Sequence, residues 1–203
     1  MIPVVADADT LFGATTRGLL IHLDYRGAIR LHWSPLILDE LSRALVDTGR
    51  KPDLASARRH EALMRTALPE AEIATAQVQA QFSAVATAMR SAKDIHVAAC
   101  AQAVRIGLSG LDAPVVHLVT HNLRDFGIRK LSALGIKVMR PDVFLTALFE
   151  QSPRELASAF ASLRATLRSA PTPELLLSRL AADGQSQAAA ALLKRWQQDD
   201  FAL

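Results

Sequence analysis

The chain has 203 residues, half of them apolar, and a formal net charge of +3. This length and composition allow one sizeable hydrophobic core with an appendage. The chain lacks a run of eighteen apolar residues, and the acids at positions 7 and 9 interrupt the apolar centre that a signal peptide needs. We therefore expect a cytoplasmic protein without a membrane partner. The single cysteine, Cys100, cannot form an internal disulfide, which agrees with a reducing compartment.

Arginine accounts for 18 of the 23 basic residues. The planar guanidinium suits bidentate phosphate contacts better than the lysine ammonium does, which favours a nucleic-acid or phosphate partner. A coding bias explains the same composition, and no single block of basic residues marks a binding surface. The charge therefore leaves both interpretations open.

Short apolar runs alternate with helical periodicity over the first 140 residues. Strands are predicted at 4–6, 115–119 and 136–139, and helices at 54–67, 76–90, 93–106 and 131–134. A further helix begins with Ser34 as its cap and Pro35 in its first turn. This alternation predicts an α/β fold in which a central parallel sheet is flanked by helices.

The pattern changes after Pro141. Apolar residues then recur every three or four positions from 156 to 167, a second helix begins at Thr172 and Pro173 and ends at Gly184, and a third covers 186–197. We therefore predict an α/β domain over residues 1–147 and an all-helical C-terminal extension over residues 148–203. The extension contains no candidate chemistry.

Polar side chains follow two of the predicted strands. Asp7 comes directly after the first strand, and Asn122 and Asp125 follow the strand that ends near Thr120. Ligands of open parallel sheets bind outside the carboxyl ends of the strands, so these groups are expected at one crevice.

Two more acids are expected to point inward from helices. Glu40 shares a helical face with Ile37 and Leu41, which predicts that its carboxylate lies on the packed side of that helix. Asp94 lies at the start of its helix on the inward stripe. Asp39, in contrast, lies on the outer face four residues before Arg43, where a surface ion pair explains it.

Each acid also has a structural explanation when it is taken alone. Asp7, Asp9 and Asp125 can accept hydrogen bonds from nearby backbone amides, Glu40 can pair with a buried arginine, and Asp94 can complement a helix dipole. Four inward acids together, however, would raise one another's pKa unless a cation neutralised them. Carboxylate ligands without a His or Cys cluster suit Mg²⁺ or Mn²⁺.

Five segments of the chain, in the same order, resemble the PIN-domain ribonucleases, and specifically the VapC-type toxins of bacterial type II toxin-antitoxin pairs. They cover residues 1 to about 147. The segments are Asp7-Ala8-Asp9-Thr10-Leu11, Trp33-Ser34-Pro35-Leu36-Ile37-Leu38-Asp39-Glu40-Leu41, Lys93-Asp94-Ile95-His96-Val97-Ala98-Ala99, Val119-Thr120-His121-Asn122-Leu123-Arg124-Asp125-Phe126 and Pro141-Asp142-Val143-Phe144-Leu145. The resemblance implies a PIN-like three-layer fold.

The resemblance also implies a metal-dependent endoribonuclease that leaves 5′-phosphate and 3′-hydroxyl ends. Its implied partners are the RNA substrate and a small antitoxin protein. The apolar stripe of the helical extension has three alternative partners, namely the domain's own helices, which we favour, a second copy of the chain, or an antitoxin segment. The family's acidic positions fall on the catalytic and metal-binding candidates Asp7, Glu40, Asp94 and Asp125, where Glu40 is either a ligand through water or the base that orients the attacking water. Thr120, Asn122 and Asp9 are supporting residues, and Arg124 is a candidate RNA contact.

The sequence departs from the family pattern at Asp9, where members commonly have Asn. The opening Asp-Ala-Asp-Thr also resembles haloacid-dehalogenase phosphatases, in which Asp7 would be the nucleophile. That family places a glycine before the threonine and needs a later lysine and a paired acidic motif, which are missing here. A catalytically silent PIN-like binding module is the third alternative.

Overall fold

The computed structural model describes residues 1–108, 114–198 and 203. Residues 199–202, at the end of the predicted C-terminal extension, therefore lie outside the described residues. The chain divides into two compact units, one formed by residues 1–12 and 30–139 and the other by residues 13–29 and 140–203. The predicted boundary at residue 147 falls inside helix α9 (Pro141–Gln151), and it stays a prediction.

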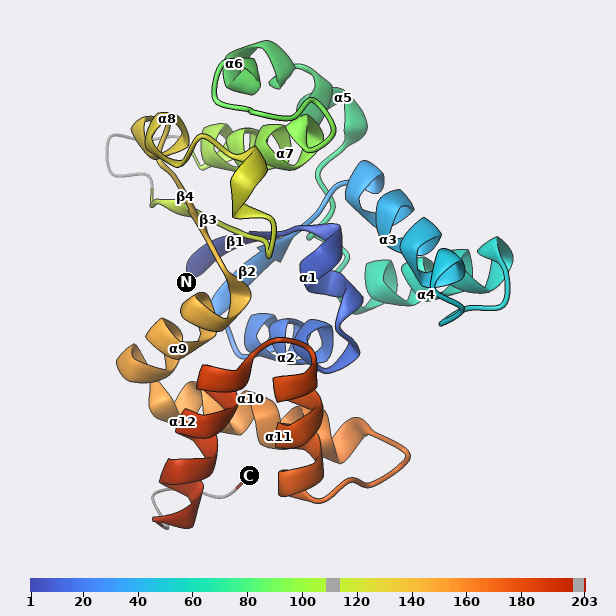
Figure 1. The fold of residues 1–203 in the computed structure, drawn as a ribbon, viewed down its shortest axis with the longest axis vertical. Coiled ribbons are helices and arrows are strands. Elements are labelled where there is room, and N and C mark those ends of the chain that lie inside the picture. The colour runs from blue at the N-terminus through green and yellow to red at the C-terminus, as the bar shows by residue number, and fades with distance from the viewer. Residues whose placement is uncertain (109–113, 199–202) are drawn as a thin grey trace. The chain divides into compact units, whose positions relative to one another are not determined.

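The first unit is built on a four-stranded parallel sheet with the order β2-β1-β3-β4 (Figure 1). The strands are β1 (Ile2–Ala6), β2 (Ile29–His32), β3 (Val116–Val119) and β4 (Ile136–Met139). In the register of the sheet, Ala6 lies opposite Val119, and Val119 lies opposite Met139. The carboxyl ends of β1, β3 and β4 are therefore level at one edge, and the predicted α/β class is confirmed.

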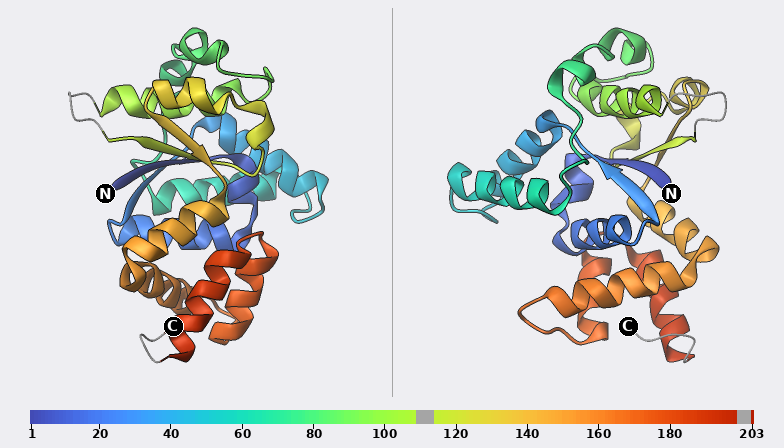
Figure 2. Two further views of the ribbon diagram at one scale, coloured as in Figure 1. Left: turned by 60° about the vertical axis from the view of Figure 1, so that its left-hand side comes forward. Right: turned by 180° about the vertical axis from the view of Figure 1, so that it is seen from behind.

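Helix α7 (Ile95–Gly107) runs along the sheet and packs against β1, β3 and β4 (Figure 2). Two short helices, α5 (Thr75–Gln79) and α6 (Phe82–Ala86), pack against α7. The prediction of one continuous helix over 76–90 was wrong. Only Val78 and Val85 are buried in these two helices, so the segment has too few apolar anchors to hold a long helix in place.

The remaining elements of this unit are α1 (Ala8–Phe12), α3 (Pro35–Asp47), α4 (Leu54–Ala67), the 3₁₀ helix η1 (Leu123–Asp125) and α8 (Ile128–Ala133). The start of α3 is as predicted, because the Ser34 hydroxyl accepts a hydrogen bond from the Ile37 amide at 3.3 Å and Pro35 is the first helical residue.

A buried carboxylate joins α3 to α4. Glu61 of α4 is 1% exposed and accepts a hydrogen bond from the hydroxyl of Ser42 on α3. Its two oxygens also lie 3.1 Å from Arg58 Nη1 and 3.0 Å from Arg65 Nη1. The buried charge is therefore fully paired, as burial of a carboxylate requires.

The second unit is a bundle of five helices: α2 (Ala14–Tyr25), α9, α10 (Pro153–Thr166), α11 (Pro173–Ala182) and α12 (Ser186–Gln197). Helix α2 packs against α10 and α11, while α12 packs against α9 and α11. The Asp183 carboxylate accepts hydrogen bonds from the amides of Thr15 and Thr16 at 2.8 and 2.9 Å, which caps the start of α2. The predicted helical C-terminal region is confirmed over α9 to α12.

Among the residues that the structure describes, no helix combines the length and apolar character needed to cross a lipid bilayer.

The pairing of Glu61 predicts a specific loss of stability. Glu61→Ala leaves the Ser42 hydroxyl without its acceptor and removes one of the two carboxylate partners of Arg58 and of Arg65, which keep Asp39 and Glu72, so the free energy of unfolding should fall by about 1–3 kcal/mol in urea denaturation. Glu61→Gln keeps an acceptor for the Ser42 hydroxyl, so its free energy of unfolding should fall less than that of Glu61→Ala. Equal stability of the native chain and the alanine variant would show that the buried pair does not hold α4 on α3.

Candidate functional site

The candidate site lies where β1 and β3 end at the same edge of the sheet. Asp7 directly follows β1, and Thr120 directly follows β3. The Asp7 amide donates to the Val119 carbonyl at 3.1 Å, and the Thr120 amide donates to the Met139 carbonyl at 3.1 Å. The register of the sheet thus fixes the backbone positions of both residues.

Asp7 is almost completely buried, with 6% of its surface exposed. One carboxylate oxygen accepts the Ala8 amide at 2.6 Å, and the other accepts the Thr120 hydroxyl at 2.8 Å. Burial, followed by the charges of Asp9 and Glu40, raises the pKa of Asp7 to about 7 despite these hydrogen bonds. At neutral pH the metal-free site therefore holds a partly protonated carboxyl.

Asp9 joins helix α1 to the loop after β3. Its Oδ2 accepts the His121 amide at 3.1 Å and lies 3.3 Å from the Thr120 hydroxyl oxygen. Each carboxylate thus has a backbone donor of its own, the Ala8 amide for Asp7 and the His121 amide for Asp9, and the Thr120 hydroxyl lies between them.

A second pair of acids converges from α7 and η1. The side-chain amide of Asn122 donates to Oδ2 of Asp94 at 3.0 Å and to Oδ2 of Asp125 at 2.6 Å. Asp94 precedes the first residue of α7, but its side chain makes no capping hydrogen bond there. Burial, followed by the neighbouring Asp125, raises the pKa of Asp94 to about 6.

Glu40 differs from the prediction. Its side chain is 45% exposed, so it does not lie on the packed face of α3 as expected, and its Oε2 forms an ion pair with His96 Nε2 at 3.2 Å. The reason is that Glu40 is at the edge of the apolar stripe, where Ile37 and Leu41 already fill the contact with the core. Asp39 forms the predicted ion pair with Arg43, at 3.0 Å.

His96 was not predicted as a site residue. Its Nδ1 lies 2.9 Å from the Lys93 carbonyl oxygen, which leaves Nε2 facing Glu40. The hydrogen bond and charge of His96 lower the pKa of Glu40. Burial lowers the pKa of His96 itself, but the interactions with Glu40 outweigh burial, and the pKa is raised. Its position on the first turn of α7, two residues after Asp94, was the available signal.

The predicted site residues thus form three local groups. Asp7 and Asp9 meet at Thr120, Asp94 and Asp125 meet at Asn122, and Glu40 meets His96. Electrostatic interactions connect the groups, because the charge of Glu40 contributes to the raised pKa values of both Asp7 and Asp94. Arg124 is exposed on η1, and its role as an RNA contact stays a prediction.

The donor chemistry of these groups fits a hard divalent cation, since every ligand candidate offers oxygen. Among the described residues, however, no three acidic, His or Cys side chains are close enough to share one ion. This arrangement fits Mg²⁺ or an ion of similar chemistry held by one or two carboxylates, because Mg²⁺ keeps several waters in its coordination shell. It does not fit a closed structural metal site.

Comparison with family models finds a match between residues 141–194 and the model described as the VapC50 C-terminal domain. The match covers helices α9 to α11 and most of α12, about a quarter of the chain, and it points to the VapC family of toxins for this region. The matched residues do not include the acidic site. The comparisons with curated proteins and with solved structures find no match.

The raised pKa of Asp7 predicts a pH-dependent stability. In the metal-free protein Asp7 binds its proton more tightly in the folded chain than in the unfolded chain, so its contribution is fully present below about pH 4 and is lost as the pH rises through 7. Asp7→Asn has no ionisable group at this position, so it should not lose stability over this pH range. In EDTA, the variant should match the native chain near pH 4 and be about 2–4 kcal/mol more stable at pH 8.

Thermal or urea unfolding at several pH values measures this difference. Asp47→Asn, at an exposed acid on α3, is the matched control and should show no such trend. A difference between native chain and Asp7→Asn that stays constant from pH 4 to pH 8 would contradict the raised pKa.

Proposed function

We propose that this protein is a divalent-metal-dependent endoribonuclease that acts as the toxin of a toxin-antitoxin pair. The observation that carries the proposal is the position of two acid pairs around the loop that follows β3, with Asp7 and Asp9 at Thr120 and with Asp94 and Asp125 at Asn122. The resemblance of five segments to PIN-domain ribonucleases supports the same activity. The match of residues 141–194 to the VapC50 C-terminal domain supports the toxin family and, with it, a small antitoxin protein as partner.

The proposed metal ligands are Asp7, Asp94 and Asp125, which would hold one or two Mg²⁺ or Mn²⁺ ions, each bound by one or two of these carboxylates and by several waters. When bound, such an ion lowers the pKa of a coordinated water and balances the negative charge that develops on the phosphate. Burial and then neighbouring negative charges raise the pKa values of Asp7 and Asp94, and a cation bound beside either carboxylate would favour its ionised form. The proximity of negative charges at the site thus favours the binding of a cation.

The other side chains of the site keep these acids in position. The Thr120 hydroxyl orients one oxygen of Asp7, and the Asn122 amide holds one oxygen each of Asp94 and Asp125. Asp9 fixes the His121 amide and thereby the loop that carries Asn122. These four hydrogen bonds leave one oxygen of Asp94 and one of Asp125 available to a ligand.

Glu40 is the proposed group that orients the attacking water. It is half-exposed, and the His96 ring beside it lowers its pKa, so it is ionised at neutral pH. The resemblance to PIN-domain ribonucleases implies that this attack leaves a 5′-phosphate and a 3′-hydroxyl. His96 is a positioning residue in this scheme, because it contacts Glu40 and not the substrate.

The phosphatase alternative fits the structure less well. A nucleophilic aspartate needs an oxygen that faces the substrate, but Asp7 is buried and both its oxygens accept hydrogen bonds from the chain.

The nuclease proposal predicts metal-dependent cleavage of RNA. The native chain should cleave total RNA in Mg²⁺ or Mn²⁺ and stop in EDTA. Asp7→Asn and Asp94→Asn should each lower the rate by at least about 100-fold, because each removes a ligand charge. Gel analysis of RNA fragments and end-group determination measure this activity, with Asp47→Asn as the matched acid-to-amide control.

The same variants separate the alternatives. Turnover of a small phosphoester that is lost in Asp7→Asn and kept in Asp94→Asn would identify a phosphatase. A folded chain that neither cleaves RNA nor turns over the phosphoester would be a silent binding module. Normal RNA cleavage by Asp94→Asn would contradict the proposed metal site.

A further inference from the structure

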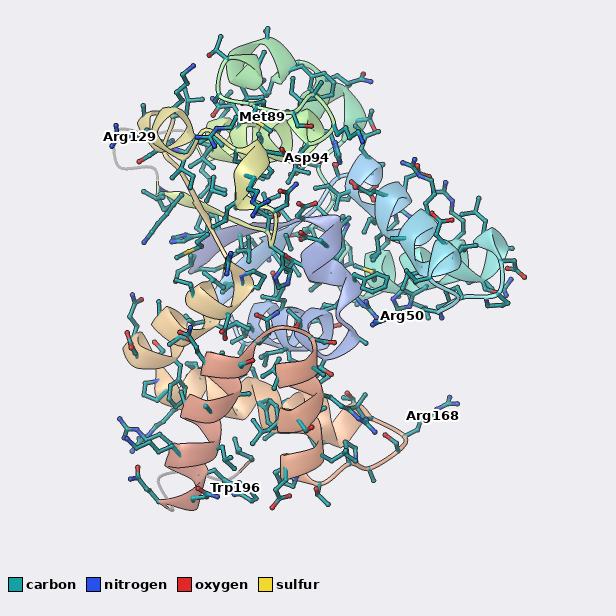
Figure 3. The ribbon with its side chains drawn as sticks, viewed as in Figure 1. Arg50, Met89, Asp94, Arg129, Arg168 and Trp196 are labelled. Atoms are coloured by element: carbon teal, nitrogen blue, oxygen red, sulfur yellow. The ribbon has the colours of Figure 1, made fainter. Side chains whose placement is uncertain are left out.

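A pocket of about 650 Å³ lies beside the acidic site in the first unit. One wall is the segment after α6, residues 87–90, and the other runs from η1 into α8, residues 123–130. Met89 and Arg129, both labelled in Figure 3, come from these two walls. The proposed function assigns no role to this pocket.

All charged residues that line the pocket are basic. Three cationic residues, Arg90, Arg129 and Lys130, line it, and none of its lining residues is acidic. All three are exposed, and none of them forms an ion pair with a residue that the structure describes. Lys130 Nζ donates to the Thr87 carbonyl at 2.7 Å, which holds the ammonium at the wall and leaves two of its three donors for a ligand.

The floor of the pocket is apolar. Met89, Leu123 and Ile128 supply the apolar surface that a ligand can reach, because all three are at least partly exposed, whereas Phe126 is fully buried and offers a ligand almost no surface. A small inorganic anion makes no apolar contacts, whereas a nucleotide does, because its base and sugar present apolar surface beside the phosphate. The pocket therefore combines the two kinds of contact that a nucleic-acid strand needs.

Backbone pairing keeps the two walls together. Met89 and Phe126 form an antiparallel bridge, and the Gly127 amide donates to the Ala88 carbonyl at 2.6 Å. A Cβ at Gly127 would come within 2.6 Å of that carbonyl oxygen, so only glycine permits this approach. These backbone contacts hold the two walls of the pocket beside each other.

The walls of the pocket are joined to Asp125 of the acidic site through the backbone. Leu123 and Phe126 flank Asp125 in the chain, and the Arg90 amide donates to the Asp125 carbonyl at 2.8 Å. A strand whose scissile phosphate lies at Asp94 and Asp125 therefore has a neighbouring nucleotide within reach of the pocket.

We propose that this pocket binds a nucleotide of single-stranded RNA next to the scissile bond, with Arg90, Arg129 and Lys130 on its phosphate and the apolar floor under its base. The inference rests on the proposed nuclease function and names how that site holds its substrate. It predicts that RNA binding depends on these cations even when no cleavage takes place.

The test is the affinity of the full chain for a fluorescent single-stranded RNA in EDTA, measured by anisotropy across a range of salt concentrations. Arg90→Ala and Arg129→Ala should each weaken binding about three- to tenfold at 0.1 M salt and reduce the slope of log affinity against log salt by about 0.7. Arg59→Ala is the matched control, because Arg59 is an exposed arginine on α4 and does not line the pocket.

Arg129→Lys keeps the charge and should retain most of the affinity and the native salt slope. Because Arg90 and Arg129 are exposed, their variants should unfold at the native temperature, which separates a binding loss from a folding loss. Unchanged affinity and slope in both alanine variants would overturn the inference, as would an equal loss in Arg59→Ala. Failure of the nuclease proposal is detected in a separate experiment, the cleavage assay, where Asp94→Asn would cleave RNA as the native chain does.

Discussion

Repulsion between carboxylates at one sheet edge is the constraint on which the rest of this site depends. The parallel register of β1 and β3 places Asp7 beside Thr120, and α7 and η1 bring Asp94 to Asp125. Removed from water, these groups resist ionisation, and the pKa values of Asp7 and Asp94 rise to about 7 and about 6. A fold that keeps such an arrangement loses stability near neutral pH unless a proton or a cation occupies the site.

The polar neighbours of the acids limit this loss without removing it. Thr120, Asn122 and the amides of Ala8 and His121 each donate to a carboxylate oxygen. These donors are neutral, so they orient the oxygens but cancel little of the negative charge. The nearby histidine pairs with Glu40 and leaves the buried acids to one another. The hydrogen bonds therefore fix the positions of the carboxylates but leave their negative charge uncompensated. A bound metal ion would compensate this charge.

Much of the fold follows from local sequence signals. The buried run before Asp7, the Ser34-Pro35 start of α3 and the apolar strand before Thr120 each have a strong local pattern, and all three elements form as predicted. Strand β2 was missed because Arg30 and His32 alternate with its apolar residues over only four positions. Helix α2 was missed as well, and its cap comes from Asp183, which lies 168 positions away from Thr15.

The site itself was predictable in part. The order of acids along parallel strands indicates which side chains share an edge, because the carboxyl ends of the strands must coincide there. The exposure of Glu40 and its pairing with His96 depend on how α3 and α7 face each other, and periodicity within one helix does not contain that information. The pocket of basic residues beside Asp125 depends in the same way on two loops that are distant in sequence.

Binding of Mn²⁺ to the native chain is the most direct test of the central claim that these acids hold a divalent cation. Calorimetric titration near pH 6.5, in two buffers of different ionisation enthalpy, measures both the affinity and the protons released. The account predicts saturable binding with proton release, because Asp7 is partly protonated at that pH, and loss of binding in Asp7→Asn and Asp94→Asn. Absence of Mn²⁺ binding by the native chain, or equal binding by both variants, would contradict it.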